Sequence, residues 1–580
     1  MGLLDSLRIG TSALLTQQAA LQVTGNNIAN VSTPGYAREE PMMAATGTSN
    51  YGAGITGGAG VKLEDVRRIV DDSLQQRVND ANSQTSQYQV AQQTLQQVES
   101  LFNAGTDTDL SSKLTALFNG FSQLVGDSAN TSQRGVVISQ AQEVVTELHR
   151  QAAGLQDLSS QLTDRMNTDV QQVNQLASNV AALNTQIVST ESDGATATSL
   201  RDQRDVAISD LSKLVSVTAR EQSNGAVTLY LGSQPLVDQG DSRKLMLATS
   251  DENGVAKQIV SFADNQGPVQ LNGGEIAGIQ TTRDGQLAQV QDRLSTLAGQ
   301  LIWQVNLVHS QGTGLEGVHN VTAANQVADP SAALSSAQTG LHFRPTNGSF
   351  FITVTTASPG VPVTSTPIQI DVSQSTSLED LTQEINDKAA GVGASIDAAG
   401  RLTLSATDPN ATLSFGPPAG ASANTPADTS HTLAALGINT FFTGTDAGSI
   451  ALQPDIADLK TGPARLAAGL TGAPGDGANA QNLANLGTQT PVAALGNVTL
   501  TQYQQQVNSD LAVWTAAARD TATSNQVVQQ ALTAQRDSLS GVSLDEEAVN
   551  LMQYQRAFQG AARFITVVDQ MLQTLLAIPT

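Results

Sequence analysis

Residues 3–31 read LLDSLRIGTSALLTQQAALQVTGNNIANV, and residues 543–576 read SLDEEAVNLMQYQRAFQGAARFITVVDQMLQTLL. In both stretches large apolar residues return every seven positions, which is the repeat of a helix that packs lengthwise against another helix. We therefore expect a helix at each end of the chain, and we expect the two helices to be neighbours in space. The candidate seam residues are Leu7, Leu14, Leu21 and Ile28 at the start, and Leu544, Leu551, Phe558, Ile565, Leu572 and Leu576 at the end.

Local signals mark where these two helices stop and start. Thr33-Pro34-Gly35 ends the first helix, because the residue before a proline is pushed out of helical geometry. Ser543 and Glu546 have the spacing of a capping box, which predicts that the last helix begins there.

Burying the two seams gains less free energy than the backbone entropy lost on ordering about 65 residues, which costs ~1–2 kcal/mol per residue. We therefore expect the ends to be disordered in the free protein and to fold when neighbouring copies cover them.

Between the ends, the pattern changes several times. Residues 71–214, 275–311 and 481–536 have a helical period, whereas residues 221–272 alternate like strands and residues 335–435 hold short alternating runs with one helix at 377–390. Trp303 is expected to be a packing anchor.

We therefore predict an α+β multidomain fold with terminal coiled-coil-like helices, a long α-helical bundle or rod, and β-rich central inserted domains. The expected parts are a terminal helical domain (1–43 and 541–580), a long-helix rod domain (44–220, 275–312 and 471–540), a β-rich domain (221–274, 313–334 and 436–470) and an inserted β-rich variable domain (335–435).

Composition excludes several classes of protein. The 580 residues include no Cys, so disulfides, thiolate metal sites and Cys nucleophiles are excluded. The net charge of −24 argues against nucleic acid or an anionic membrane as partner. The sequence has no run of ~18 apolar residues and no Sec-type signal at its start, so we expect no membrane span and, if the protein leaves the cell, another export route.

No arrangement of residues predicts catalysis. The five histidines (His149, His309, His319, His342 and His431) form no close ligand pair, and no P-loop or GxSxG motif is present. We expect no catalytic residues, no metal and no cofactor.

At this point the end segments show a resemblance. Residues 6–39 and 540–576 resemble the N- and C-terminal signatures of flagellar axial proteins, the family of rod, hook and hook-associated proteins. The matching residues around the first turn include Asn26, Asn27, Asn30, Pro34, Gly35 and Tyr36. Segments 58–78, 283–315 and 436–452 are most similar to those of the junction proteins between hook and filament, whereas residues 370–406 are similar to inserts of flagellins and filament-cap proteins.

The resemblance implies a role and partners. It implies a homo-oligomer that polymerises through its terminal helices into a ring-like layer, contacting hook protein and a second junction protein (hook-associated protein 3). It also implies type III export without a cleaved signal, an extracellular location in the flagellum, and a cytosolic export chaperone that holds the C-terminal helices.

Two alternatives remain open at this stage. The chain could be another axial protein of the hook type, or an extracellular adhesin whose insert 335–435 binds a surface. An enzyme domain within 312–470 would need clustered acids or histidines, which the sequence lacks there.

Overall fold

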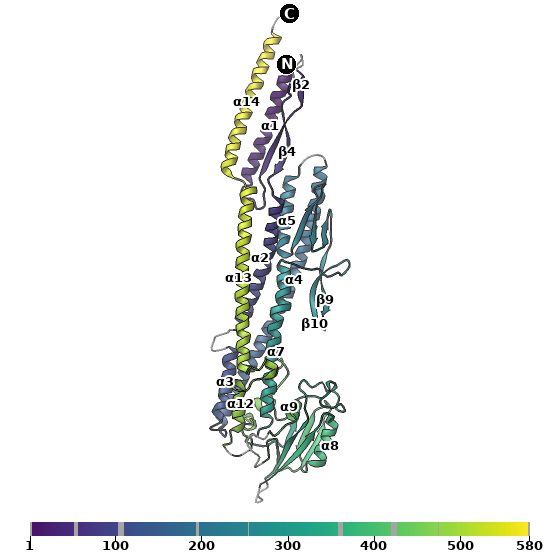
Figure 1. The fold of residues 1–580 in the computed structure, drawn as a ribbon, viewed down its shortest axis with the longest axis vertical. Coiled ribbons are helices and arrows are strands. Elements are labelled where there is room, and N and C mark those ends of the chain that lie inside the picture. The colour runs from purple at the N-terminus through teal and green to yellow at the C-terminus, as the bar shows by residue number, and fades with distance from the viewer. Residues whose placement is uncertain are drawn as a thin grey trace. The chain divides into compact units, whose positions relative to one another are not determined.

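A computed structural model of the chain describes residues 3–50, 56–102, 109–192, 196–252, 255–357, 363–418, 426–471, 473 and 475–577. The chain divides into two compact units, which we describe separately (Figure 1). Unit 1 comprises Met1–Thr94, Ser160–Gly285 and Ala516–Thr580, and unit 2 comprises Leu95–Ser159 and Gln286–Thr515. The division falls inside three long helices: α2 (Asp72–Phe102), α4 (Thr131–Glu191) and α13 (Leu500–Ser540).

Unit 1 holds both chain ends. Helix α1 (Leu3–Ala29) packs against α14 (Leu544–Leu576), and the antiparallel ribbon of β1 (Glu39–Ala45) and β4 (Val61–Arg68) packs along α1. A shorter pair, β2 (Thr48–Asn50) and β3 (Thr56–Gly58), follows β1.

The rest of unit 1 combines helices with two small antiparallel sheets. A four-stranded sheet has the order β5 (Val217–Glu221), β6 (Val227–Leu231), β7 (Gln234–Asp238) and β8 (Asp241–Ser242). Strands β9 (Leu245–Glu252) and β10 (Val255–Phe262) form a separate ribbon. The remaining helices are α5 (Thr198–Leu214), α6 (Glu275–Thr282) and a π-helical turn, η1 (Arg283–Leu287).

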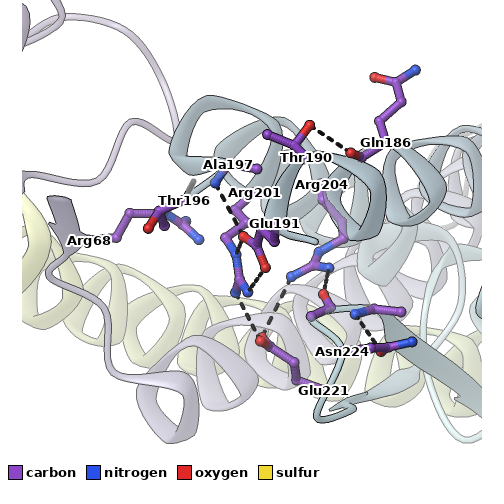
Figure 2. A network of polar contacts seen from close by, with 12 residues as sticks. Arg68, Gln186, Thr190, Glu191, Thr196, Ala197, Arg201, Arg204, Glu221 and Asn224 are labelled. Atoms are coloured by element: carbon purple, nitrogen blue, oxygen red, sulfur yellow. Dashed lines mark hydrogen bonds and ion pairs between the residues drawn. The ribbon is translucent and has the colours of Figure 1, made fainter. Parts of the chain in front are cut away.

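A polar network fastens α4 and α5 to the four-stranded sheet (Figure 2). The Arg201 guanidinium donates to Glu191 at 2.6 Å and to Glu221 at 2.9 Å. The buried Arg204 donates to the carbonyl of Gly225 at 2.6 Å. Because an unpaired buried guanidinium is costly, these partners fix how the hairpin lies on the helices.

Unit 2 contains a group of helices and a β-rich domain. The helices and short strands are α3 (Leu110–Leu124), α7 (Ala288–His309), α9 (Thr432–Leu436), β17 (Phe442–Thr443), β18 (Ala451–Leu452), α10 (Pro454–Ala457), α11 (Gly462–Arg465) and α12 (Ala478–Thr488), with 3₁₀ turns η2 (Ala337–Thr339) and η3 (Ala493–Leu495). Helices α3 and α12 pack closely, because Gly487 lies against the ring of Phe118.

The β-rich domain, which we call the insert, is built from two three-stranded sheets and one helix. The first sheet has the order β13 (Thr364–Val372), β12 (Gly348–Thr356) and β16 (Ala411–Ser414), and the second has the order β11 (Asn320–Thr322), β15 (Leu402–Ala406) and β14 (Val392–Ile396). Helix α8 (Leu378–Lys388) begins with a capping box between Ser377 and Asp380. The buried core shared by these elements runs from Ala323 to Ile438.

Trp303 of α7 is the packing anchor that the sequence predicts. Its ring stacks on Phe343 with centroids 4.4 Å apart, and His431 meets its edge at 6.2 Å. The α+β multidomain fold is confirmed, with long helices and several small sheets. None of the helices in the described ranges is long and apolar enough to cross a membrane.

Candidate functional site

The paired helices α1 and α14 carry the residues that the sequence singled out. Two contacts fix their antiparallel direction: Gly10 lies against Ile565, and Asn27 contacts Glu547. A Cβ atom on Gly10 would lie 2.7 Å from Cγ1 of Ile565, so the helices approach closely at that glycine. The fully buried positions of α1 are mainly small or polar: Gly10, Thr16, Ala20, Val23, Thr24 and Asn27.

The expected seam residues differ in their burial in the single chain. Leu7, Leu14, Leu21, Ile28, Leu551, Phe558, Ile565 and Leu572 are half-buried, whereas Leu544 is 52% exposed and Leu576 is 84% exposed. Ile565 lies at the close approach of the two helices, against Gly10.

Exposed apolar residues also follow α14, and one of them, Phe564, borders Gly10 of α1 as well. Val549, Met552, Phe564, Val567, Met571 and Leu575 are all exposed, at spacings of three, four or a multiple of these. We call these six residues the outer stripe. Large apolar residues gathered on one exposed face mark a surface that another molecule covers.

Both ends are helical and packed together in the single chain, which differs from the expectation that they order only on assembly. Three contributions besides burial of the seam residues hold the two ends together in the structure. These are the close packing of small residues, the β1–β4 ribbon along α1, and a buried polar cluster at the base of the pair.

The turn that leaves α1 depends on Pro34 and Gly35. Tyr36 donates its backbone N–H to the carbonyl of Thr33 at 3.2 Å, and Gly35 has φ +78°. Proline at the second position and a positive φ at the third are the pattern of a type II turn. A Cβ atom on Gly35 would lie 2.2 Å from Cγ2 of Val206 on α5, so only glycine fits here. Asn30 accepts the backbone N–H of Thr33 at 2.9 Å through its own carbonyl, while Asn26 accepts that of Asn30 at 3.0 Å.

Asn27 is the centre of the buried polar cluster. Its Nδ2 donates to the carbonyl of Glu39 at 2.8 Å and to Oε2 of Glu547 at 3.2 Å. Its Oδ1 accepts from the Tyr36 hydroxyl at 2.8 Å and from the backbone N–H of Glu39 at 3.0 Å. One amide side chain therefore connects α1, the turn, β1 and α14.

Arg38 completes the cluster from the side of α14. Its Nε lies 2.9 Å from Oε1 of Glu547, which is only 1% exposed, and its Nη1 pairs with Glu546. Its backbone N–H donates to the carbonyl of Ser540 at 2.9 Å. The predicted capping box is therefore only half formed: Ser543 Oγ accepts the Glu546 N–H at 3.5 Å, but the Glu546 carboxylate turns to Arg38.

A second ion-pair cluster fastens β4 to α5. Arg68 Nη2 lies 2.7 Å from Asp202 and 2.5 Å from Asp205. Burial raises the pKa of Asp202 to about 6, although the Arg68 guanidinium acts in the opposite direction. Burial and the carboxylates of Glu39, Asp202 and Glu547 raise the pKa of Tyr36 above its ordinary value, so its phenol remains a hydrogen-bond donor.

Two clefts flank the turn. One of about 560 Å³ is lined by residues 30–37, Arg68, α5 and the segment around Gly541, and one of about 570 Å³ lies on the side of Thr198 and Asp202. The turn is consequently held by specific contacts at a few atoms rather than by a filled core.

The histidines lie apart from this region. His309 is fully buried, with Nδ1 at 2.8 Å from the Asn439 carbonyl and Nε2 accepting from the Ala467 N–H at 3.0 Å. Burial lowers its pKa to about 4, so the ring is neutral. Within the described part of the chain, no three His, Cys, Asp or Glu side chains gather as metal ligands would.

Sequence reasoning identified Asn27 and Tyr36 but missed Arg38 and Glu547 as their partners. The acidic run 545–547 lies in the first turn of α14, where acids suit the positive end of a helix, and so gives no sign of the contact. Its only signal was the rarity of adjacent acids in a chain with 14% charged residues.

Four family models match parts of the chain. The "Flagellar hook-associated protein FlgK helical domain" matches residues 95–323, and the "Flagella basal body rod protein" model matches residues 7–36. The "Flagellar basal body rod FlgEFG protein C-terminal" model matches residues 533–578, and the "Flagellin hook IN motif" matches residues 352–408. The resemblance of the insert to flagellin inserts is thereby confirmed.

Whole proteins with known names are similar along the full length. The chain is 25% identical to flagellar hook-associated protein 1 of Salmonella typhimurium, over 98% of each chain. It is 26% identical to that of Bacillus subtilis, over 98% of this chain and 97% of the relative. The solved structure of the flagellar hook junction protein FlgK from Burkholderia pseudomallei has a TM-score of 0.51 at 16% identity, covering 80% of this chain and 100% of the other, and supports the fold. The resemblance found from the two end segments is confirmed.

Proposed function

We propose, for a chain that resembles flagellar hook-associated protein 1 from end to end, a structural role at the junction between hook and filament of the bacterial flagellum. The protein assembles there as a homo-oligomeric, ring-like layer. We propose no enzymatic activity, because its relatives are named as flagellar hook-associated proteins and its end segments form a surface rather than a reaction site.

The observation that carries this proposal is the apolar surface of the terminal pair. The outer stripe of α14 and the seam residues Leu544 and Leu576 are exposed in the single chain, whereas the centre of the pair is already filled. We propose that neighbouring copies and adjoining axial subunits cover these residues. The seam residues and the signature turn are then the polymerisation elements of the domain 1–43 and 541–580.

We propose partner proteins that cover the same apolar surface. The protein associates with the hook and other axial proteins, and we propose hook protein on one side and hook-associated protein 3 on the other. In the cytosol, an export chaperone covers α14, because exposed apolar residues would otherwise aggregate before assembly. Export by the type III route without a cleaved signal places the protein outside the cell, in the flagellum.

The direct test uses isolated hooks and purified protein. The full-length chain should bind to hook ends, and a chain truncated after residue 544 should not. A matched pair of variants refines the test: Val567→Ser with Met571→Ser removes two exposed apolar residues and should weaken binding, whereas Gln559→Ser changes an exposed polar residue of the same helix and should not. Undiminished binding of the truncated chain would refute the proposal.

The role in the cell can be tested by deleting the gene. We expect hooks without filaments, and flagellin released into the medium. Normal filaments on the mutant would contradict a junction role.

A further inference from the structure

We propose that Asn27, Arg38 and Glu547, which we call the latch, are positioning residues that couple the docking of α14 to closure of the signature turn. Through the latch, α14 docks and presents the outer stripe only when the turn at residues 33–36 has formed. This consequence for assembly rests on the proposed function, but the coupling itself does not.

The first argument is that one buried side chain joins three other segments. Asn27 uses both atoms of its amide, and its four hydrogen bonds reach the Tyr36 hydroxyl of the turn, the backbone N–H and carbonyl of Glu39 in β1, and the Glu547 carboxylate of α14. The Glu547 carboxylate is buried and has Asn27 and Arg38 as its partners on the other segments. Removing Asn27 takes a partner from this buried carboxylate, and removing Glu547 takes one from the buried amide, so each loss weakens the contacts that remain.

The second argument is that few other contacts hold the turn at residues 33–36 in place. Clefts of about 560 and 570 Å³ lie on two sides of the turn, and the close apolar contact of the turn is Gly35 against Val206. Where packing is sparse, the orientation of the emerging chain is set by the polar contacts. The latch contacts therefore hold the first turn of α14 against α1 and the start of β1, while the contact of Gly10 with Ile565 holds the pair farther along.

The third argument is the double anchoring by Arg38. Its backbone holds the carbonyl of Ser540 at the end of α13, while its side chain holds Glu546 and Glu547 at the start of α14. The connection between these two helices, residues 541–543, is thus spanned by one residue of the opposite chain end. A residue placed there positions α14 without touching the outer stripe.

The experiment is amide hydrogen exchange on the full-length monomer, with the insert strands β12 and β16 as an internal reference. Glu547→Gln and Asn27→Ala should each raise exchange over 544–560 by about tenfold or more, because a buried partner is left unpaired. The double variant Asn27→Ala/Glu547→Gln should exchange no faster than the worse single variant. A purely additive effect would show two independent structural contacts and overturn the coupling.

The matched control is Asp545→Asn, which changes an exposed acid in the same helical turn. Its exchange should differ little from that of the unaltered protein, and an effect equal to that of Glu547→Gln would overturn the latch. Unchanged protection in Glu547→Gln would do the same. If the latch variants behave as expected but the unaltered protein fails to bind hooks, the proposed function falls and the coupling stands.

Discussion

The terminal helix pair and the insert bury opposite kinds of residue. In the insert, large side chains such as Phe350, Ile370 and Leu404 are fully enclosed by the sheets and α8. In the α1–α14 pair, most buried positions of α1 are small or polar, α14 buries Glu547 and Val568, and most of the large apolar residues are half-buried or exposed. The insert is therefore complete as a single chain, whereas the terminal pair has surface left for another molecule.

Because of this difference, we expect the folding stability of the protein and its assembly to depend on different residues. A domain that encloses its large residues responds to core substitutions with a loss of folding free energy. A pair that exposes them can lose the same residues with little effect on its own stability. Four predictions test this division, from the largest expected effect to the smallest.

Phe350→Ala should produce the largest loss. The ring is fully buried in the insert, so its removal should lower the free energy of unfolding by about 3–5 kcal/mol. Urea unfolding, followed by exchange of the insert strands, measures it. Phe351→Ala, on the half-buried opposite face of the same strand, is the control and should cost less. Hook binding should survive in both, and its loss with Phe350→Ala would break the proposed separation.

Gly35→Ala should have an intermediate effect, confined to the terminal pair. A φ of +78° and a Cβ position 2.2 Å from Val206 predict a cost of about 1–3 kcal/mol. Thermal unfolding monitored by exchange in α1 and α14 measures the change. Gly25→Ala has no atom within 4 Å of the new Cβ and lies inside a helix, so it should stabilise by up to about 1 kcal/mol. Equal effects of the two substitutions would contradict the role of the turn.

Deprotonation of the Tyr36 phenol at high pH should weaken the terminal pair and leave the insert unaffected. The pKa of Tyr36 is raised in the folded state above the ordinary value of about 10, so its contribution is complete below that pH and is lost as the pH rises through the folded-state pKa. Exchange over α1 and α14 should therefore accelerate above pH 10. Tyr36→Phe should remove the part of this dependence that Tyr36 causes, leaving the part from Tyr554 of α14, whose pKa burial also raises, and no tyrosine lies within residues 323–438 to cause the same effect there.

Val567→Ser should have the smallest effect on stability. The side chain is 51% exposed, so the free energy of unfolding should change by no more than about 0.5 kcal/mol, while binding to hooks weakens. Val363→Ser in the insert is the control, since that residue is exposed but lies far from the ends in sequence. If both substitutions reduce hook binding equally, exposure alone does not define the assembly surface.

Much of the architecture could be predicted from periodicity. The long helices, the hairpin at residues 227–238 and the helix beginning after Ser377 all have local signals, and the structure contains each. The two end motifs also predicted that α1 and α14 would be neighbours. The local elements share one cause, since their deciding residues lie within a few turns or strands of one another, whereas the pairing of α1 with α14 was predicted from an apolar repeat at each end of the chain.

The latch could not be predicted in the same way. Nothing near Asn27 indicates that its amide meets Glu547, because the two residues are joined only through the folded chain. A heptad of leucines shows which side of a helix is apolar, but it does not show that α14 comes close to α1 at Gly10, where Ile565 lies.

The contact between Asn27 and Glu547 spans 520 positions of the chain. Closing so long a loop carries an entropy cost that grows with the logarithm of its length, and contacts of high sequence separation slow folding. The helices and sheets in between can form from nearer contacts, so the two ends are expected to meet last. Joining of the ends would then report that the rest of the subunit has already folded.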